Sequence, residues 1–131
     1  MKVLVIGGTR FMGIHLVHSL IINKHDVTIA TRGMTPDDFG STVKRIIIDR
    51  SNGDSIRNAL SKNKYDIVYD NLAYCSNDVK LILENLKCEK YILLSSTAVY
   101  DKHPDTEMLQ KDYGKYIFTT FISNFELYNS P

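Results

Sequence analysis

Cysteine, proline and tryptophan are scarce in this chain of 131 residues, which contains 2, 3 and 0 of them. The cysteines, Cys75 and Cys88, have neither metal-knuckle nor CxxC spacing, so we expect free thiols in a reducing compartment. The histidines show no metal-binding spacing either, and no metal site is expected. Apolar runs are too short to cross a membrane, and the run after Met1 is too short for a signal peptide. These absences predict a cytoplasmic protein without a membrane partner.

An excess of one charge is also lacking, because 16 Lys and Arg residues face 15 Asp and Glu residues. A near-neutral chain without a basic stripe argues against nucleic acid as a partner. Hydrophobic residues make up 44% of the chain, which is ordinary for a globular protein. The length suits a single domain, 1–131, that is able to bury a core.

Five short apolar runs, rich in β-branched residues, divide the chain. They are nearly continuous rather than alternating, which is typical of strands buried on both faces of a parallel sheet. Helical patterns separate most of them, which predicts a doubly wound α/β fold with strand order 3-2-1-4-5. The expected strands are 3–6, 27–30, 45–48, 67–69 and 91–94, and the expected helices are 12–22, 54–62 and 77–86. Asn23 is expected to end the first helix, Asp54 to cap the second, and 31–44 to form a loop or brief helical turn.

The most informative segment is the glycine-rich stretch from Gly7 to Gly13, which follows the first apolar run and opens the first helical pattern. Glycine lets the backbone turn tightly and approach a phosphate, and the N–H groups and dipole at a helix N-terminus favour anions. We therefore expect a dinucleotide pyrophosphate to bind here. The expected contacts are Gly7, Thr9, Arg10, Phe11, Met12 and Gly13.

Together these motifs resemble the short-chain dehydrogenase/reductase superfamily, most closely its extended branch of NAD-dependent epimerases and dehydratases. Gly7, Arg10 and Gly13 occupy the places of that branch's GxxGxxG turn, and residues 94–100, LSSTAVY, resemble its SSxxVY segment. The resemblance implies a Rossmann fold that binds a nicotinamide dinucleotide. It covers nearly the whole chain but only the first half of a typical member. We therefore expect either part of a longer protein or a natural short form, truncated before the substrate-binding lobe.

The resemblance also implies cofactor contacts after the third and fourth strands. Asp49, beside Arg50, stands where the family keeps an acid that hydrogen-bonds the adenine amino group. Leu72 and Ala73 follow the fourth strand, beside the expected position of the nicotinamide ribose.

Two departures from the family pattern concern the choice of cofactor. Arg10 replaces the middle glycine of the turn, and its guanidinium either binds a phosphate or is solvated on the loop. Thr31 and Arg32 end the second strand, where an NAD-preferring site has an acid for the ribose 2′-hydroxyl. A missing carboxylate beside an arginine favours a 2′-phosphate, so we expect NADP to be preferred over NAD.

For catalysis, the resemblance implies a hydroxyl, a tyrosine and a lysine. The SSxxVY likeness places the hydroxyl at Ser96, whose alternative role is to bond backbone groups of its loop. Tyr113 begins a likeness to the family's YxxxK motif, but Ile117 stands where the lysine belongs. Without a nearby cation a tyrosine is only about 0.1% ionised near pH 7, so Tyr113 is either catalytic or an ordinary helix tyrosine.

Two functions remain open at this stage. The first is an NAD(P)-binding oxidoreductase domain that transfers hydride at a hydroxyl or carbonyl carbon of a small-molecule substrate, with sugar nucleotides as one class. The second is a non-catalytic nucleotide-binding or regulatory module. RNA association is a variant of the second, because plant relatives with a similar GGTRFxG turn resemble nucleic-acid-binding proteins. A homodimer is also possible, through residues that otherwise cover the sheet: Leu81, Leu83, Leu86, Phe118, Phe121 and Phe125.

Overall fold

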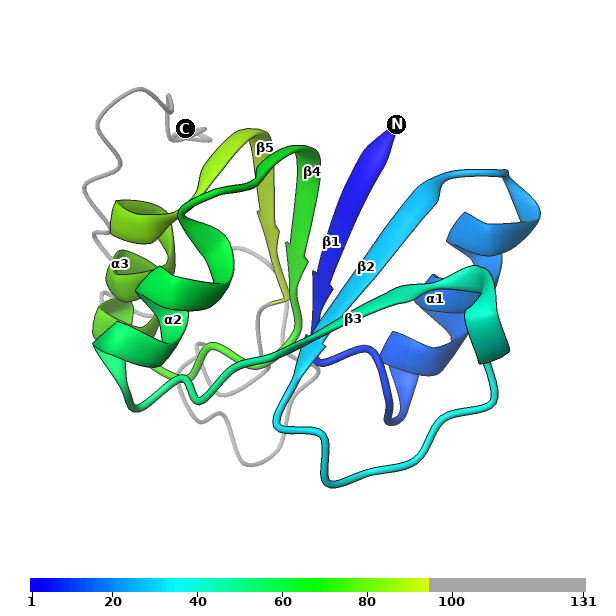
Figure 1. Ribbon diagram of the computed structural model, residues 1–131, viewed down its shortest axis with the longest axis horizontal. Coiled ribbons are helices and arrows are strands. Elements are labelled where there is room, and N and C mark those ends of the chain that lie inside the picture. The colour runs from blue at the N-terminus through cyan, green and yellow to red at the C-terminus, as the bar shows by residue number, and fades with distance from the viewer. Residues whose placement is uncertain (95–131) are drawn as a thin grey trace, which may run out of the picture.

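A computed structural model describes residues 1–94 of the chain, which form a five-stranded parallel sheet (Figure 1). The strands are β1 (Lys2–Ile6), β2 (Asp26–Thr31), β3 (Lys44–Ile47), β4 (Lys64–Asp70) and β5 (Lys87–Leu93). Their order in the sheet is β3-β2-β1-β4-β5, as predicted. β4 and β5 begin earlier than predicted, because backbone pairing extends past the apolar run and joins Lys64 to Lys87.

The helices are α1 (Met12–Ile22), α2 (Gly53–Leu60) and α3 (Ser76–Asn85), with a short 3-10 turn, η1 (Gly40–Thr42), before β3. Figure 1 shows α1 on one face of the sheet and α2 with α3 on the other. The predicted doubly wound α/β fold is therefore confirmed. Within residues 1–94, no helix is both long and apolar enough to cross a membrane.

β1 explains why the strands have continuous apolar sequences. Its side chains alternate between two core clusters: Leu4 and Ile6 pack with residues of α2 and α3, whereas Val3 and Val5 pack with residues of α1. All four are fully buried. A strand covered on both faces has no polar side, so the alternation seen in half-exposed strands is lost.

The predicted N-cap of the second helix is wrong. Asn52, not Asp54, caps α2, because its side-chain oxygen accepts hydrogen bonds from the N–H groups of Asp54 and Ser55. Asp54 lies inside the first turn, where its negative charge still suits the helix dipole. The helix therefore begins one residue earlier than predicted. Asn23 does end α1, as predicted.

Leu81 of α3 and Leu86 at its C-cap cover the sheet, which was one of the two roles considered for these leucines. Leu86 is buried in the core cluster beneath α2 and α3, and Leu81 packs against it. Leu83 is half-buried. The phenylalanines of the proposed dimer face lie outside the described residues, so a homodimer stays a prediction.

Four backbone hydrogen bonds hold the chain together just past the carboxyl ends of the strands. Each N–H donor is the first residue after the end of its strand. They run from Gly7, Ile48, Asn71 and Leu94 to the carbonyl oxygens of Ala30, Thr31, Ile6 and Asp70, at 3.0, 2.9, 3.1 and 2.9 Å. The segments that leave the sheet therefore start from fixed positions, side by side.

Candidate nucleotide-binding site

A cavity of about 860 Å³ opens at the carboxyl ends of β1 to β4. Of the twelve residues predicted to bind the cofactor, eleven line it. They are Gly7, Thr9, Arg10, Phe11, Met12, Gly13, Thr31, Arg32, Asp49, Arg50 and Leu72. Ala73, the twelfth, is half-buried and is not part of the lining. Ser96 and Tyr113 lie outside the described residues.

The glycine turn brings α1 against the end of β1. Gly7 has a φ of 83°, a left-handed value that favours glycine. A Cβ added at Gly13 would lie 2.3 Å from the carbonyl oxygen of Gly7, so only glycine allows this close approach. Among the described residues, no side chain caps the N-terminus of α1, and its first turn contains no acid. The positive end of the helix dipole thus faces the cavity, and a pyrophosphate fits there.

Arginine is tolerated at the middle position of the turn because the left-handed residue is its neighbour. Phe11, at the N-cap position of α1, has a φ of 49°, whereas Arg10 has no positive φ. A non-glycine residue in such a conformation is strained by about 1–3 kcal/mol, and such residues cluster at ligand sites. The Phe11 side chain is 85% exposed at the mouth of the cavity, so core packing does not offset this strain.

Two arginines and a threonine line the cavity near the end of β2. The Nε atom of Arg10 donates to Oγ1 of Thr35 at 3.2 Å. Arg32 follows β2 directly, and no acid stands at this strand end. All three side chains belong to the cavity lining. Guanidinium and hydroxyl donors are the groups that hold a phosphate.

Asp49 is an ionised acceptor in the same cavity lining as Arg32. Its Oδ1 atom accepts from the Ser51 hydroxyl at 2.6 Å and from the Ser51 N–H at 2.9 Å. These hydrogen bonds, helped by the charge of Arg32, hold the pKa of Asp49 below its usual value. A carboxylate that accepts hydrogen bonds suits an amino group such as that of adenine.

Arg50, which also lines the cavity, pairs with a buried carboxylate. Nη1 of Arg50 lies 2.6 Å from Oδ1 of Asp70, which is completely buried at the end of β4. The Tyr91 hydroxyl, from β5, donates to the other oxygen of Asp70, and the Leu72 N–H donates to Oδ1 at 2.9 Å. Burial and the charge of Asp70 raise the pKa of Tyr91, which keeps the phenol protonated as a donor. This Arg50–Asp70–Tyr91 cluster joins the ends of β3, β4 and β5.

The comparisons with known proteins agree with this geometry. Residues 3–85 match a family model described as the NAD dependent epimerase/dehydratase family. The chain belongs to this family. The resemblance inferred from the glycine turn and the strand ends is thereby confirmed.

One relative and two solved structures are similar to this chain over most of its length. The chloroplast stem-loop binding protein of 41 kDa b from Arabidopsis thaliana is 37% identical and is matched over 77% of this chain and 30% of its own length. The UDP-Glc/GlcNAc 4-epimerase of Campylobacter jejuni has a TM-score of 0.71 at 15% identity, over 86% of this chain and 42% of that one. Yeast methylglyoxal/isovaleraldehyde reductase Gre2, solved with NADPH, has a TM-score of 0.65 at 21% identity, over 77% and 39%. The chain thus spans less than half the length of these proteins.

Several lining residues of this family member were not predicted from the sequence. Thr35 and Tyr74 lie in loops and carry no motif, so no signal in the sequence indicates them. The partnership of Arg50 with Asp70 could have been predicted in part. A carboxylate that ends an apolar, buried strand requires a cation or several donors.

Asp78 also lines the cavity, and it makes the stability of α3 depend on pH. It accepts from the N–H groups of Tyr74, at 2.9 Å, and Cys75, at 3.3 Å, and these contacts, with the charge of Arg50, lower its pKa. The pKa of Asp78 in the folded protein is lower than its unfolded value of about 3.9. The ionised carboxylate therefore stabilises the fold fully when the pH is above the unfolded pKa. This stabilisation is lost as the pH falls through the folded pKa.

We therefore expect Asp78→Asn to lose less stability than the wild type when the pH is lowered from about 5 to about 3. The measurement is urea unfolding at several pH values in that range. Equal losses in the two proteins would contradict the assignment. Asp37 and Asp49, whose pKa values are also lowered, remain in the variant and set its residual slope.

Proposed function

We propose that this chain is the dinucleotide-binding part of an NADP-preferring epimerase or reductase that transfers hydride at a hydroxyl or carbonyl carbon. The observation that carries the proposal is the end of β2, where Arg10, Arg32 and Thr35 line the cavity and no acid stands. A carboxylate there would accept from a ribose 2′-hydroxyl and repel a 2′-phosphate, whereas guanidinium groups attract the phosphate. The NADPH bound to the yeast reductase is consistent with this choice.

In this proposal the chain's residues bind and orient the cofactor, which supplies the hydride. The turn from Gly7 to Gly13 holds the pyrophosphate at the N-terminus of α1, and Asp49 accepts from the adenine amino group. Ser96 and Tyr113 are the proposed groups at the substrate oxygen, on the strength of the motifs they occupy. Ile117 occupies the motif position of the lysine, which is the cation expected to lower the pKa of a catalytic tyrosine. The substrate is a small molecule, with sugar nucleotides as one class, and a cytoplasmic location remains our prediction.

The cofactor preference is tested by titrating the chain with NADPH and NADH. We expect NADPH to bind about tenfold more tightly, and Arg32→Ala to remove most of this difference, because one charge-assisted hydrogen bond is worth about 1.5 kcal/mol. Arg57→Ala is the matched control, since Arg57 pairs with Asp54 on the surface of α2, away from the cavity lining. Tighter binding of NADH to the wild type would contradict the preference. Absence of binding to either would contradict the proposed function.

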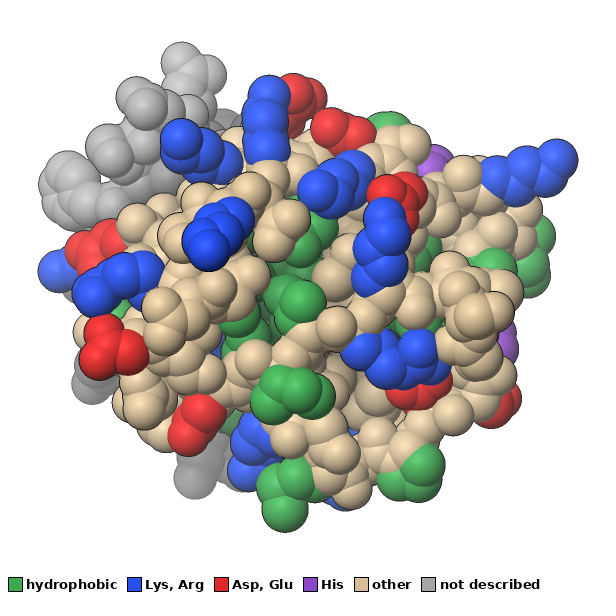
Figure 2. Space-filling view, in the orientation of Figure 1, with side chains coloured by type: hydrophobic (Ala, Val, Ile, Leu, Met, Phe, Trp, Pro, Cys, Tyr) green, Lys and Arg blue, Asp and Glu red, His purple; other side chains and the backbone are tan. Residues whose placement is uncertain are grey.

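A second candidate function is binding of structured RNA, which the name of the Arabidopsis relative favours. The charge distribution argues against RNA binding. On the face shown in Figure 2, Lys and Arg side chains are scattered, and Asp and Glu side chains lie beside several of them. Phosphate contacts make RNA binding steeply dependent on salt. Retention on a stem-loop RNA at 50 mM salt that disappears at 200 mM would support this function, and no retention at 50 mM would exclude it.

A further inference from the structure

The segment that joins β2 to β3, residues 32–43, presents Arg32 and Thr35 to the cavity but contains no regular structure except η1. Backbone hydrogen bonds alone therefore do not fix its shape. In doubly wound folds a crossover helix commonly fills this place and supplies such bonds. Here side chains replace the helix: buried Phe39 and Val43 belong to the core cluster that packs with α1.

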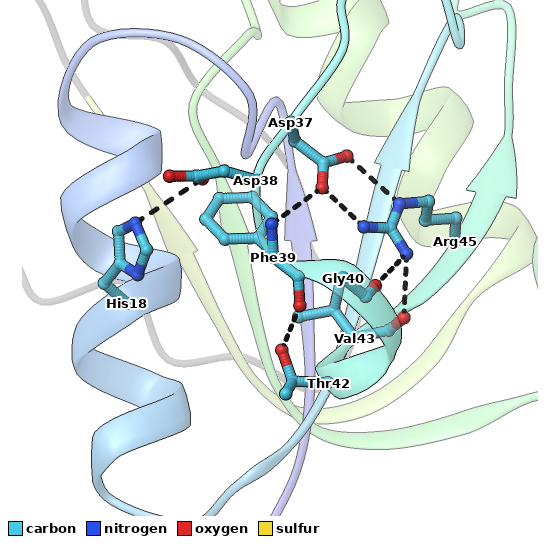
Figure 3. A network of polar contacts seen from close by, with 8 residues as sticks. All are labelled: His18, Asp37, Asp38, Phe39, Gly40, Thr42, Val43 and Arg45. Atoms are coloured by element: carbon cyan, nitrogen blue, oxygen red, sulfur yellow. Dashed lines mark hydrogen bonds and ion pairs between the residues drawn. The ribbon is translucent and has the colours of Figure 1, made fainter.

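Arg45, on β3, is the main polar anchor of this segment (Figure 3). Its Nε atom donates to Oδ2 of Asp37 at 3.0 Å, and its Nη2 atom donates to Oδ1 of the same carboxylate. Its Nη1 atom donates to the carbonyl oxygens of Gly40, at 2.8 Å, and Val43, at 3.2 Å. One guanidinium thus binds three points of the segment. A lysine ammonium cannot reproduce this planar fork.

Asp37, the partner of Arg45, is largely buried and makes a further hydrogen bond. Its side chain is only 10% exposed, and it also accepts from the N–H of Phe39 at 3.2 Å. The hydrogen bonds from Arg45 hold the pKa of Asp37 below its usual value, so the pair is ionised at neutral pH. On the other side of the segment, the His18 ring of α1 meets the Phe39 ring edge-on, with 5.0 Å between ring centroids (Figure 3).

The Arg45–Asp37 pair lies outside the cavity but close to its lining along the chain. Neither residue belongs to the lining, so neither is placed to touch a ligand in it. Asp37 follows Thr35 by two positions, with Pro36 between them, and Pro36 fixes the backbone φ there. Thr35 is in turn bonded by Arg10. The hydrogen bonds of Arg45 with Asp37 and of Arg10 with Thr35, joined by the short backbone stretch through Pro36, therefore connect β3 to the glycine turn.

We propose that Arg45 is a positioning residue for cofactor selectivity: with Asp37 it holds residues 32–43 in the shape that presents Thr35 and Arg32 to the 2′-phosphate of NADPH. This inference rests on the proposed function. Without the pair, the segment becomes ordered only when the cofactor binds. The loss of conformational entropy makes the binding free energy less favourable, so the affinity falls. NADH, which has no 2′-phosphate, gains less from the ordered segment and loses less when the pair is broken.

The test compares dissociation constants for NADPH and NADH in the wild-type chain and in Arg45→Ala, Arg45→Lys and Asp37→Asn. We expect each variant to bind NADPH about three- to tenfold more weakly, while its affinity for NADH changes by less than about twofold. Arg57→Ala, which breaks the exposed Asp54–Arg57 pair of α2, is the control and should leave both affinities unchanged. Urea unfolding of each variant shows that the protein measured is folded.

Three outcomes would overturn the inference. In the first, folded Arg45 and Asp37 variants bind NADPH as the wild type does. In the second, both affinities fall by the same factor, which is the mark of a structural role without selectivity. In the third, the wild type binds neither dinucleotide, and the proposed function fails together with the inference. If the wild type prefers NADPH but the variants keep that preference, the proposed function stands and only the role of Arg45 is wrong.

Discussion

Replacing Asp70 with alanine is expected to lower the free energy of unfolding by about 3–5 kcal/mol, because the substitution leaves the Arg50 guanidinium buried without its partner. Asp70 is completely buried, and the Arg50 side chain is 15% exposed. Within residues 1–94, Nε and Nη2 of Arg50 are buried and have no hydrogen-bond partner. Asp70 is the acid that pairs with Arg50 directly, whereas Asp78 acts on it only through its charge. A loss of this size is a large part of the stability of an ordinary domain, which is about 5–15 kcal/mol.

The measurement is equilibrium unfolding in urea, with an ion pair of the surface as the control. Asp54→Ala breaks the exposed Asp54–Arg57 pair of α2 and should cost no more than about 1 kcal/mol. The double variant Arg50→Met with Asp70→Ala should be more stable than Asp70→Ala, because it contains no unpaired buried charge. If Asp70→Ala proved as mild as Asp54→Ala, the charge of Arg50 would have another partner or access to water.

The fold could be predicted from the sequence because its determinants are local. Val3 to Ile6 is continuously apolar, which indicates a strand buried on both faces, and the alternation of such runs with helical patterns indicates the layers. The strand order was predicted from the same alternation and was confirmed. The end of α1 at Asn23 was also predicted. The N-cap of α2 was not, because Asn52 and Asp54 both have side chains that can cap a helix, and the choice depends on the backbone path after β3.

The candidate site was predictable where it lies within one turn and not where it joins distant segments. The spacing of Gly7 and Gly13 indicates the turn. The bonds from Arg10 to Thr35 and from Arg45 to Asp37 cross 25 and 8 positions of the chain, and no periodic pattern encodes either. The Arg50–Asp70 pair spans 20 positions. Such contacts become visible only in the folded chain, where the ends of the parallel strands meet and the segment before β3 packs against it.

Replacing Gly13 with alanine is expected to weaken NADPH binding by about 100-fold, because it displaces the first turn of α1 from the end of β1. The added Cβ would lie 2.3 Å from the Gly7 carbonyl oxygen and 3.1 Å from the Gly8 Cα, and backbone atoms cannot yield as the end of a flexible side chain can. If the turn donates two backbone hydrogen bonds to the charged pyrophosphate, their loss at about 1.5 kcal/mol each would correspond to this factor. Crowding of this kind also lowers the free energy of unfolding, by about 1–3 kcal/mol.

Gly53→Ala provides the matched control for this prediction. Gly53 is the first residue of α2, and a Cβ there would approach only the Leu81 Cδ2 atom, at an ordinary contact distance of 3.9 Å. Alanine has the higher helix propensity, so this variant should be as stable as the wild type or slightly more stable, and it should bind NADPH equally well. Titration and urea unfolding of both variants separate the two effects. If Gly13→Ala bound NADPH like Gly53→Ala, the pyrophosphate would not lie on the N-terminus of α1, and the turn from Gly7 to Gly13 would serve only to pack the helix against the sheet.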